Sequence, residues 1–332
     1  MTTMDRIQTG DELERCPFPI PFGWYAIDHS DSLAPGEVRD LQAFDSEWVL
    51  FRGEDGSVGI TDPYCPHLGA HLAKGGTIVG SNIRCPFHHW QFDSKGWCKD
   101  IPYGKRMPEL ARRKPILHAL PVEEKLGLIW AWYHPTGGAP SFDLPGDVPE
   151  LDDRENYIEP RRGEWQIGTC LQEIGENNVD NAHLRFLHGS PEIPPIEASS
   201  QDHVWNVKIG NDERGIVGQN VGPGIQIYRH RRGDLSMLMF STPLPLTRES
   251  THLRMLFSFK EYAEGTPERA ELENIYQHSI GAVDGEEGAG FEAVDLVVWD
   301  NKKYRPKPLL CDGDGPIAAW RKYYQQFYAE EG

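Results

Sequence analysis

The chain has 332 residues and a formal net charge of −18, with 33 Lys and Arg against 51 Asp and Glu. Hydrophobic residues make up 39% of it, which is enough for packed cores and excludes wholesale disorder. The acidic balance disfavours non-specific binding to nucleic acid, which depends on Lys and Arg. No apolar run approaches the ~20 residues of a membrane-spanning helix. No secretory signal is visible, and six cysteines are too few for a disulfide scaffold. We therefore expect a cytoplasmic protein without a membrane span.

The first part of the chain predicts a small all-β domain. Residues 1–22 are polar and then rich in proline, which indicates an extended N-terminal lead-in. From 23 to 135, short β-like runs alternate with turn signals, and Trp48–Arg52 is followed by an Asp55-Gly56 hairpin signal. The segment 136–162 is rich in Pro and Gly, as linkers are.

Residues 163–332 have a different pattern. The stretch 164–189 is long enough for a helix, and a mostly helical tail is expected over 317–328. Strand-like runs lie between them, at 224–230, 235–242 and 251–260. Helices combined with an antiparallel series of strands predict an α+β domain over 163–332.

Two mixed pairs of Cys and His lie in the predicted all-β domain, Cys65 with His67 and Cys85 with His88. Two thiolates on one iron and two neutral imidazoles on the other are the ligands of a Rieske [2Fe–2S] cluster. The alternative is a structural zinc site, but zinc modules favour tight Cys-Cys and His-His pairs. We therefore predict a [2Fe–2S] cluster.

The chain resembles the Rieske non-haem iron oxygenases at these residues. The segments from Cys65 to Gly76 and from Cys85 to Phe92 are similar to the cluster loops of that family. The subgroup it resembles oxidises steroids and sterols: the oxygenase component of 3-ketosteroid 9α-hydroxylase and the Neverland-type cholesterol 7-desaturases. The segments around Gly96–Tyr103 and Pro308–Tyr328 also resemble this subgroup. The sequence departs from the family at His89, where Gly or Asp is more usual, and lacks the N-terminal membrane anchor of the animal desaturases.

A second metal would distinguish an oxygenase from an electron carrier. His183 and His188 are five residues apart, so in a straight helix their side chains would diverge by about 140°. The helix must end or bulge after His183 for both imidazoles to reach one ion, and Gly189 and Pro191 favour such an end. The alternative is a pair of ordinary helix-end histidines.

A ferrous oxygenase site needs a carboxylate beside two histidines. Asp295 stands four residues before Trp299, as in the family that the chain resembles. Glu292 shares its helical face and is the rival ligand. We expect His183, His188 and Asp295 to hold a mononuclear Fe(II).

The resemblance gives Asp180 a separate role. In the family, an acid at this place links the His of the mononuclear iron to a cluster His of the adjacent subunit. Asp180 would then accept a hydrogen bond from the non-ligating nitrogen of His183 and bond His88, or else His67, of a neighbour. The alternative is a local helix-capping Asp.

The resemblance implies a terminal oxygenase component with a catalytic domain of helix-grip type, in a ring-shaped homotrimer. It implies O₂ as co-substrate and hydroxylation of a C–H bond in a steroid or sterol-like hydrophobic molecule. Desaturation, oxidative demethylation, an aromatic or alkaloid substrate, and a Rieske electron carrier without catalysis are the alternatives.

No Gly-x-Gly-x-x-Gly motif for a nicotinamide or flavin is visible, so electrons must come from a ferredoxin or a reductase. Residues 84–114 are locally basic, and the stretch around 95–114 is a candidate docking surface for an acidic donor. The apolar runs 225–228, 237–240 and 256–259 line a substrate cavity or form plain core.

Overall fold

The computed structural model describes residues 10–280 and 291–329. The chain forms two compact units: an N-terminal unit, Phe22–Asp147, and a C-terminal unit that combines Met1–Pro21 with Val148–Gly332. The predicted lead-in thus belongs to the C-terminal unit, and the predicted linker 136–162 is divided between the two. None of the described helices is long and apolar enough to cross a membrane.

The N-terminal unit consists almost entirely of strands, as predicted, arranged in three antiparallel sheets with the orders β1-β10-β9, β2-β3-β4 and β5-β6-β7-β8. The predicted hairpin at Asp55-Gly56 is the β3–β4 turn. The elements are β1 (Gly23–His29), β2 (Val38–Ala43), β3 (Ser46–Arg52), β4 (Val58–Thr61), β5 (Thr77–Val79), β6 (Asn82–Arg84), β7 (Gln91–Phe92), β8 (Cys98–Asp100), α1 (Glu109–Arg113), β9 (Val122–Lys125) and β10 (Leu128–Tyr133).

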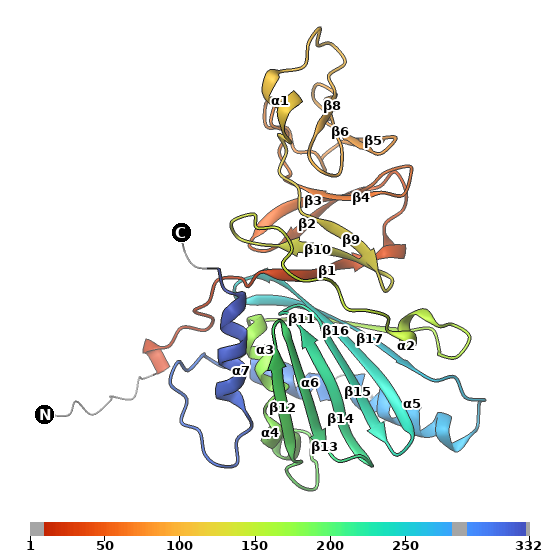
Figure 1. Cartoon of the computed structure of the whole chain (residues 1–332), viewed down its shortest axis with the longest axis vertical. Coiled ribbons are helices and arrows are strands. Elements are labelled where there is room, and N and C mark those ends of the chain that lie inside the picture. Colours follow the sequence, from red (N-terminus) through yellow and green to blue (C-terminus); the bar gives the residue numbers. More distant parts are fainter. Residues whose placement is uncertain (1–9, 281–290, 330–332) are drawn as a thin grey trace, which may run out of the picture. The chain divides into compact units, whose positions relative to one another are not determined.

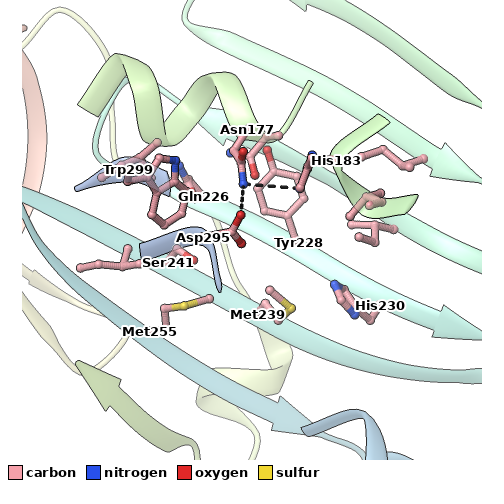
Figure 2. A pocket seen from close by; sticks show the side chains of 16 residues that line it. Asn177, His183, Gln226, Tyr228, His230, Met239, Ser241, Met255, Asp295 and Trp299 are labelled. Atoms are coloured by element: carbon pink, nitrogen blue, oxygen red, sulfur yellow. Dashed lines mark hydrogen bonds between the residues drawn. The ribbon is translucent and has the colours of Figure 1, made fainter. Parts of the chain in front are cut away.

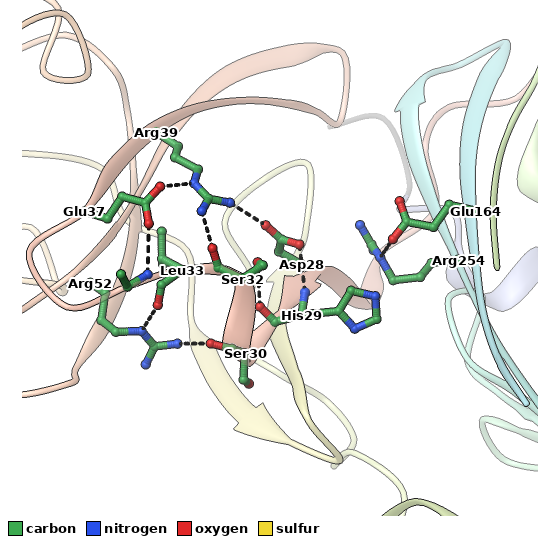
Figure 3. Close-up of polar contacts among 11 residues, drawn as sticks. Asp28, His29, Ser30, Ser32, Leu33, Glu37, Arg39, Arg52, Glu164 and Arg254 are labelled. Carbon is green, nitrogen blue, oxygen red and sulfur yellow. Dashed lines mark hydrogen bonds and ion pairs between the residues drawn. The ribbon is translucent and has the colours of Figure 1, made fainter. Parts of the chain in front are cut away.

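A buried arginine ties the strands of this unit together. Arg52, at the end of β3, is 8% exposed, and its guanidinium pairs with both carboxylate oxygens of Glu124 on β9 at 2.7 and 2.9 Å. It also donates to three backbone carbonyls, including those of Ser30 and Leu33 (Figure 3). All five of its N–H donors are therefore used, which is what makes a buried charge tolerable.

The C-terminal unit is built on one antiparallel sheet in the order β11-β17-β16-β15-β14-β13-β12 (Figure 1). Few helices accompany it, so the α+β class is confirmed. The elements are α2 (Pro149–Asp152), β11 (Arg161–Ile167), α3 (Leu171–Asn177), α4 (Asn181–Phe186), β12 (Ile196–Gln201), β13 (Val204–Gly210), β14 (Arg214–Val221), β15 (Gln226–Arg232), β16 (Leu235–Thr247), β17 (Ser250–Phe259), α5 (Pro267–Ile280), α6 (Phe291–Trp299) and α7 (Ile317–Tyr324).

The predicted single helix over 164–189 is wrong. Its first residues lie in β11, whose side chains alternate in burial and which pairs with β17 along its whole length. Glu164 on β11 forms an ion pair with the buried Arg254 on β17, at 3.2 Å (Figure 3). The rest forms two short helices, α3 and α4, separated at residues 178–180. Strand pairing has overridden local helix propensity here.

β16 extends beyond its predicted end at residue 242. Pro243 and Pro245, beyond that end, both pair with β17 and continue the strand. The register of β15 ends at Gln226 opposite Ser241, so no described strand pairs with that side of β16 at either proline. A residue without an N–H is tolerated at such an edge.

The segment before α7 packs against the junction of α3 and α4. A side chain at Gly315 would place its first carbon 1.8 Å from the carbonyl oxygen of Val179, so only glycine fits. Trp320 on α7 is fully buried and lies edge-on to Trp205 of β13, with ring centroids 5.4 Å apart. The C-terminal segment therefore holds α3 and α4 in place over the sheet.

Two candidate metal centres

The two predicted cluster loops in the N-terminal unit share one backbone conformation. In each loop the cysteine amide donates to the carbonyl five residues later, at 2.9 Å for Cys65 and 2.8 Å for Cys85. The cysteine carbonyl accepts from the amide four residues later, at 2.9 and 3.1 Å. The two loops are therefore structural repeats that present a Cys and a His each.

This repeat explains the unusual His89. The residue four places after the cysteine has a left-handed backbone in both loops, with φ of +74° at Gly69 and +60° at His89. Glycine adopts this conformation without steric cost, whereas histidine is one of the few side chains found there with any frequency. His89 is exposed and serves the turn, so the departure from the family pattern leaves the loop intact.

The four predicted cluster ligands lie on these adjacent loops. Cys65 and Cys85 are each 2% exposed, and the rings of His67 and His88 lie 4.8 Å apart between centroids. Burial, aided by the neighbouring Cys85, raises the pKa of the Cys65 thiol to about 11, so its thiolate needs a bound cation. The buried Nδ1 of His88 has no hydrogen-bond partner among the described residues. This donor set fits a [2Fe–2S] cluster.

Aromatic side chains cover the histidine side of these loops. Trp90 stacks on His67 with centroids 4.6 Å apart and planes 9° from parallel. Its indole N–H donates to the hydroxyl of Tyr103 at 2.9 Å. Cys98 is 5% exposed and belongs to the same hydrophobic core as Cys65 and Cys85. Hydrophobic cover of this kind controls solvent access and thereby the reduction potential.

The second centre lies in the C-terminal unit, where His183, His188 and Asp295 converge. Their ligand atoms all lie within 4.8 Å of one another. Among the residues that the structure describes, no other three His, Cys, Asp or Glu side chains come this close together. His188 Nε2 is 3.1 Å from Asp295 Oδ2, and Asp295 is 2% exposed. Burial lowers the pKa of His183, which favours the neutral imidazole that a metal needs. Two neutral imidazoles and one buried carboxylate fit a ferrous ion.

The end of α4 brings the two histidines together, as predicted. The helix ends at Phe186, and the amide of His188 donates back to the carbonyl of His183 at 3.3 Å. Gly189 follows with φ of +70°. The two imidazole rings consequently lie close together in an edge-to-face arrangement, with centroids 5.1 Å apart.

Asn177 at the end of α3 is a site residue that the sequence did not single out. Its side-chain amide donates to Asp295 Oδ1 at 3.1 Å and lies 3.4 Å from His183 Nε2 (Figure 2). Glu173 and Glu176, which the sequence could not separate from it, instead form ion pairs with Lys302 and Arg321. No sequence signal distinguishes the three; only their contacts do.

Asp180 has a different local role from the one expected. Its Oδ1 caps α4 by accepting from the amides of Ala182 and His183, at 3.1 and 3.3 Å. The Nδ1 of His183 forms a hydrogen bond with the backbone carbonyl of Asp180. The carboxylate oxygen Oδ2 of Asp180 lies 4.0 Å from the same Nδ1. The expected bond from His183 to this carboxylate is therefore wrong, because the cap turns the carboxylate toward the helix amides. The second oxygen, Oδ2, accepts neither of these amide bonds.

Glu292, the rival ligand, belongs to α6 with Asp295. Its side chain lies outside the described residues, so the choice between the two carboxylates rests on the geometry of Asp295.

A cavity of about 60 Å³ is lined by two of the three converging residues, His183 and Asp295. Half of its lining residues are apolar, and among them Met239 and Met255 line it from β16 and β17 (Figure 2). Of the predicted apolar runs, 225–228 contributes Gln226 and Tyr228 to this wall, 237–240 contributes Met239, and 256–259 contributes no residue. Side chains in a strand alternate between its two sides, so the neighbours of these residues in the strands point away from the cavity. The polar side chains in the wall are Asn177, Asn178, His183, Gln226, Tyr228, His230, Ser241 and Asp295.

Comparisons with known proteins agree with both centres. Residues 23–111 match the Rieske [2Fe-2S] domain, and residues 131–328 match the 3-Ketosteroid 9alpha-hydroxylase C-terminal domain. Cholesterol 7-desaturase from Caenorhabditis elegans is 31% identical, over 98% of this chain and 81% of the relative. A probable 3-ketosteroid-9-alpha-monooxygenase oxygenase component from Rhodococcus rhodochrous is 30% identical, over 99% and 84%.

The fold is shared with solved structures at low sequence identity. Dicamba monooxygenase bound to dicamba superposes with a TM-score of 0.65 at 18% identity, over 92% of this chain and 96% of that one. NdmB of Pseudomonas putida CBB5 gives a TM-score of 0.69 at 15% identity, over 91% and 89%.

The family matches cover both units, and each unit contains the ligand set for its metal. The cofactors are a [2Fe–2S] cluster and a mononuclear non-haem iron, and such a component requires an external electron donor. The chain belongs to the Rieske non-haem iron oxygenases, as a terminal oxygenase component with the 3-ketosteroid 9alpha-hydroxylase type of C-terminal domain.

Proposed function

We propose that this oxygenase hydroxylates a C–H bond of a steroid or sterol-like molecule. The observation that carries the proposal is the convergence of His183, His188 and Asp295, two of which, His183 and Asp295, line a cavity whose wall is half apolar. The printed names of the relatives supply the substrate class, 3-ketosteroids and cholesterol. Desaturation is the second candidate, because relatives named cholesterol 7-desaturase reach 32% identity.

In this proposal each ligand set holds one metal centre. Cys65, His67, Cys85 and His88 bind the cluster, and His183, His188 and Asp295 bind the iron. Bound Fe(II) with open coordination positions supplies the site at which O₂ reacts beside the substrate. Asn177 fixes the orientation of the Asp295 carboxylate, and the methionine-lined walls orient the substrate and exclude water.

We further propose a ring-shaped homotrimer in which Asp180 of one subunit bonds His88 of the next. Two features of Asp180 support this proposal. Its side chain is 35% exposed, and its Oδ2 accepts neither of the amide hydrogen bonds that cap α4. Leu68, Phe87 and Tyr103, beside the cluster histidines, are 64%, 60% and 59% exposed. Clustered apolar side chains of this size are the usual mark of an interface. Sedimentation of the purified protein as a monomer would contradict the trimer.

An acidic ferredoxin is the proposed electron donor. Lys95, Lys105, Arg106 and Lys114 are exposed and form no ion pair with any described residue, whereas the other cations of 84–114 are bonded to Thr77, Asp93 or Glu109. We expect K105E/R106E to slow cluster reduction severalfold at low salt, and high salt to remove the difference. Arg248→Glu, on the turn between β16 and β17, is the matched control. Equal reduction rates at low salt would contradict this docking surface.

The reducing cytoplasm is the compartment that suits this chemistry. All six cysteines are free thiols in the structure, and cluster assembly needs Cys65 and Cys85 reduced.

The direct test of the proposed function is product analysis. Protein reconstituted anaerobically with iron and sulfide is supplied with a ferredoxin, its reductase and O₂, against a panel of 3-ketosteroids, sterols and aromatic acids. We expect a product 16 mass units heavier than a steroid or sterol, and a product 2 units lighter would select desaturation. H188A, which leaves the cluster ligands in place, is the control and should form neither. Turnover of the aromatic acids alone would overturn the substrate class.

A further inference from the structure

A second and larger cavity in the C-terminal unit adjoins the iron pocket. Its volume is about 430 Å³, against about 60 Å³ for the pocket that His183 and Asp295 line, and the third proposed iron ligand, His188, lines the larger cavity. The two spaces share four lining residues, namely Leu184, Ile209, Ile216 and His230. The segment 188–195, the ends of β14 and β15, and α5 supply the remaining wall. A substrate too long for the smaller space would extend into the larger one.

The wall changes from neutral to cationic along β15. Gln226, Tyr228, His230 and Arg232 occupy alternate positions and so face one side of the sheet. Gln226 and Tyr228 line the iron pocket, His230 lines both spaces, and Arg232 lines only the larger cavity. Along this face of β15 the side chains therefore change from neutral, at Gln226 and Tyr228, to cationic, at Arg232.

A second arginine lies directly opposite Arg232. Arg214 on β14 pairs with Arg232 in register, and like charges in such cross-strand pairs are destabilising. Glu271 of α5 forms an ion pair with Arg232. Arg214 makes no ion pair with any residue that the structure describes, and it is exposed to the cavity. The charge of Arg214 thus remains available to a ligand.

The charged residues of this wall are Arg214, Arg231, Arg232 and Glu192. By the alternation along β15, the side chain of Arg231 lies on the opposite side of the sheet from that of Arg232, and Glu271 pairs with Arg232. Arg214 is therefore the arginine that faces the cavity without an ion pair to a described residue. Guanidinium groups bind carboxylates through paired, charge-assisted hydrogen bonds. The ligand group that best fits this wall is a carboxylate.

We propose that the larger cavity binds a carboxylate at the end of the substrate remote from the oxidised carbon. Arg214 is the principal donor, and Arg232 is the second. The apolar body of the substrate would lie between this carboxylate and the iron ligands. The identity of that body as a steroid rests on the proposed function. The carboxylate site adds a charged end group as a determinant of specificity.

The test compares a 3-ketosteroid whose side chain ends in a carboxylate with its methyl ester, which has the same body and no charge. Calorimetry on the iron-loaded protein should show the acid binding at least tenfold tighter. Because a hydrogen bond to a charged group contributes about 1.5–3 kcal/mol, R214Q should weaken acid binding roughly ten- to a hundredfold. Binding of the ester should not change, and R248Q should behave as wild type with both compounds.

The outcomes separate this inference from the proposed function. Equal affinity of wild type for acid and ester would overturn the carboxylate site, as would equal weakening of both by R214Q. A preference for the acid that R214Q removes, without oxidation of either compound, would support the site and contradict steroid oxidation. Oxidation of the ester without any preference for the acid would support steroid oxidation and contradict the carboxylate site. Failure of both compounds to bind would contradict both.

Discussion

At the iron site a single amide, that of Asn177, contacts both kinds of ligand. It donates to the carboxylate of Asp295 and lies beside the ring of His183. The sequence predicted His183, His188 and Asp295 as ligands because His, His and Asp are chemically distinctive, and the structure brings the three together. An Asn among polar neighbours has no such signature. A residue that orients a metal ligand becomes visible only when α3 and α6 are placed together.

We expect N177A to reduce Fe(II) affinity or turnover about ten- to a hundredfold, as loss of a hydrogen bond to a metal ligand commonly does. The cluster should be unaffected, because its ligands lie in the N-terminal unit. Metal titration and the visible spectrum of the cluster measure the two effects. Asn301→Ala, on the exposed end of the same helical region as Asp295, is the matched control. Wild-type iron affinity in N177A would refute the role of Asn177.

The left-handed residue of the second cluster loop gives another prediction. His89 has φ of +60°, at the position that glycine occupies in the first loop. H89G should raise the free energy of unfolding by up to about 1 kcal/mol, since relief of strain exceeds the entropy that glycine adds to the unfolded chain. H89A keeps the strain and should not. Thermal unfolding of the cluster-loaded variants distinguishes them, and equal stability of the two would contradict the explanation.

At the level of elements, the break between α3 and α4 forms the iron site. The sequence required a helix end after His183 and located it correctly near Gly189, because five-residue spacing is incompatible with a straight helix. It did not reveal that residues 161–167 form a strand, since the partner β17 is about ninety residues away. Non-local pairing of this kind is what a local pattern cannot show.

Asp180 joins the cap of α4 to the proposed link between subunits, and two substitutions separate these roles. D180A removes the cap and should lower the free energy of unfolding by about 1 kcal/mol. D180N retains a capping side chain and should unfold like wild type, while product formation falls because the charge that would bond the neighbouring His88 is lost. Unfolding curves and single-turnover product yield measure the two. Full product yield from D180N would leave Asp180 as a cap only.

The contact of Gly315 with Val179 makes the C-terminal segment part of the iron site. G315A should lower the free energy of unfolding by about 1–3 kcal/mol, because its methyl group would overlap a backbone carbonyl. Iron content of the purified protein should fall with it. Gly313→Ala is the matched control, because the nearest atom to its methyl group would be the sulfur of Cys311 at 3.8 Å. Equal stability of the two variants would contradict the packing role.

For the whole molecule, the cofactors could be predicted more completely than the substrate. The cluster ligands are contiguous motifs, and Asp295 was found through its spacing to Trp299. The arginines of the larger cavity were missed because β14 and β15 had to be paired before Arg214 and Arg232 became neighbours. The alternation of polar residues over 226–232 was the available signal.

We propose that this chain holds two independent metal centres, each within one unit. The content of iron and acid-labile sulfide per chain, measured after anaerobic reconstitution, distinguishes two centres from one. We predict about three irons and two sulfides for wild type, about two of each for H188A, and about one iron without sulfide for C85S. A wild-type content of two irons, or loss of sulfide from H188A, would contradict the account.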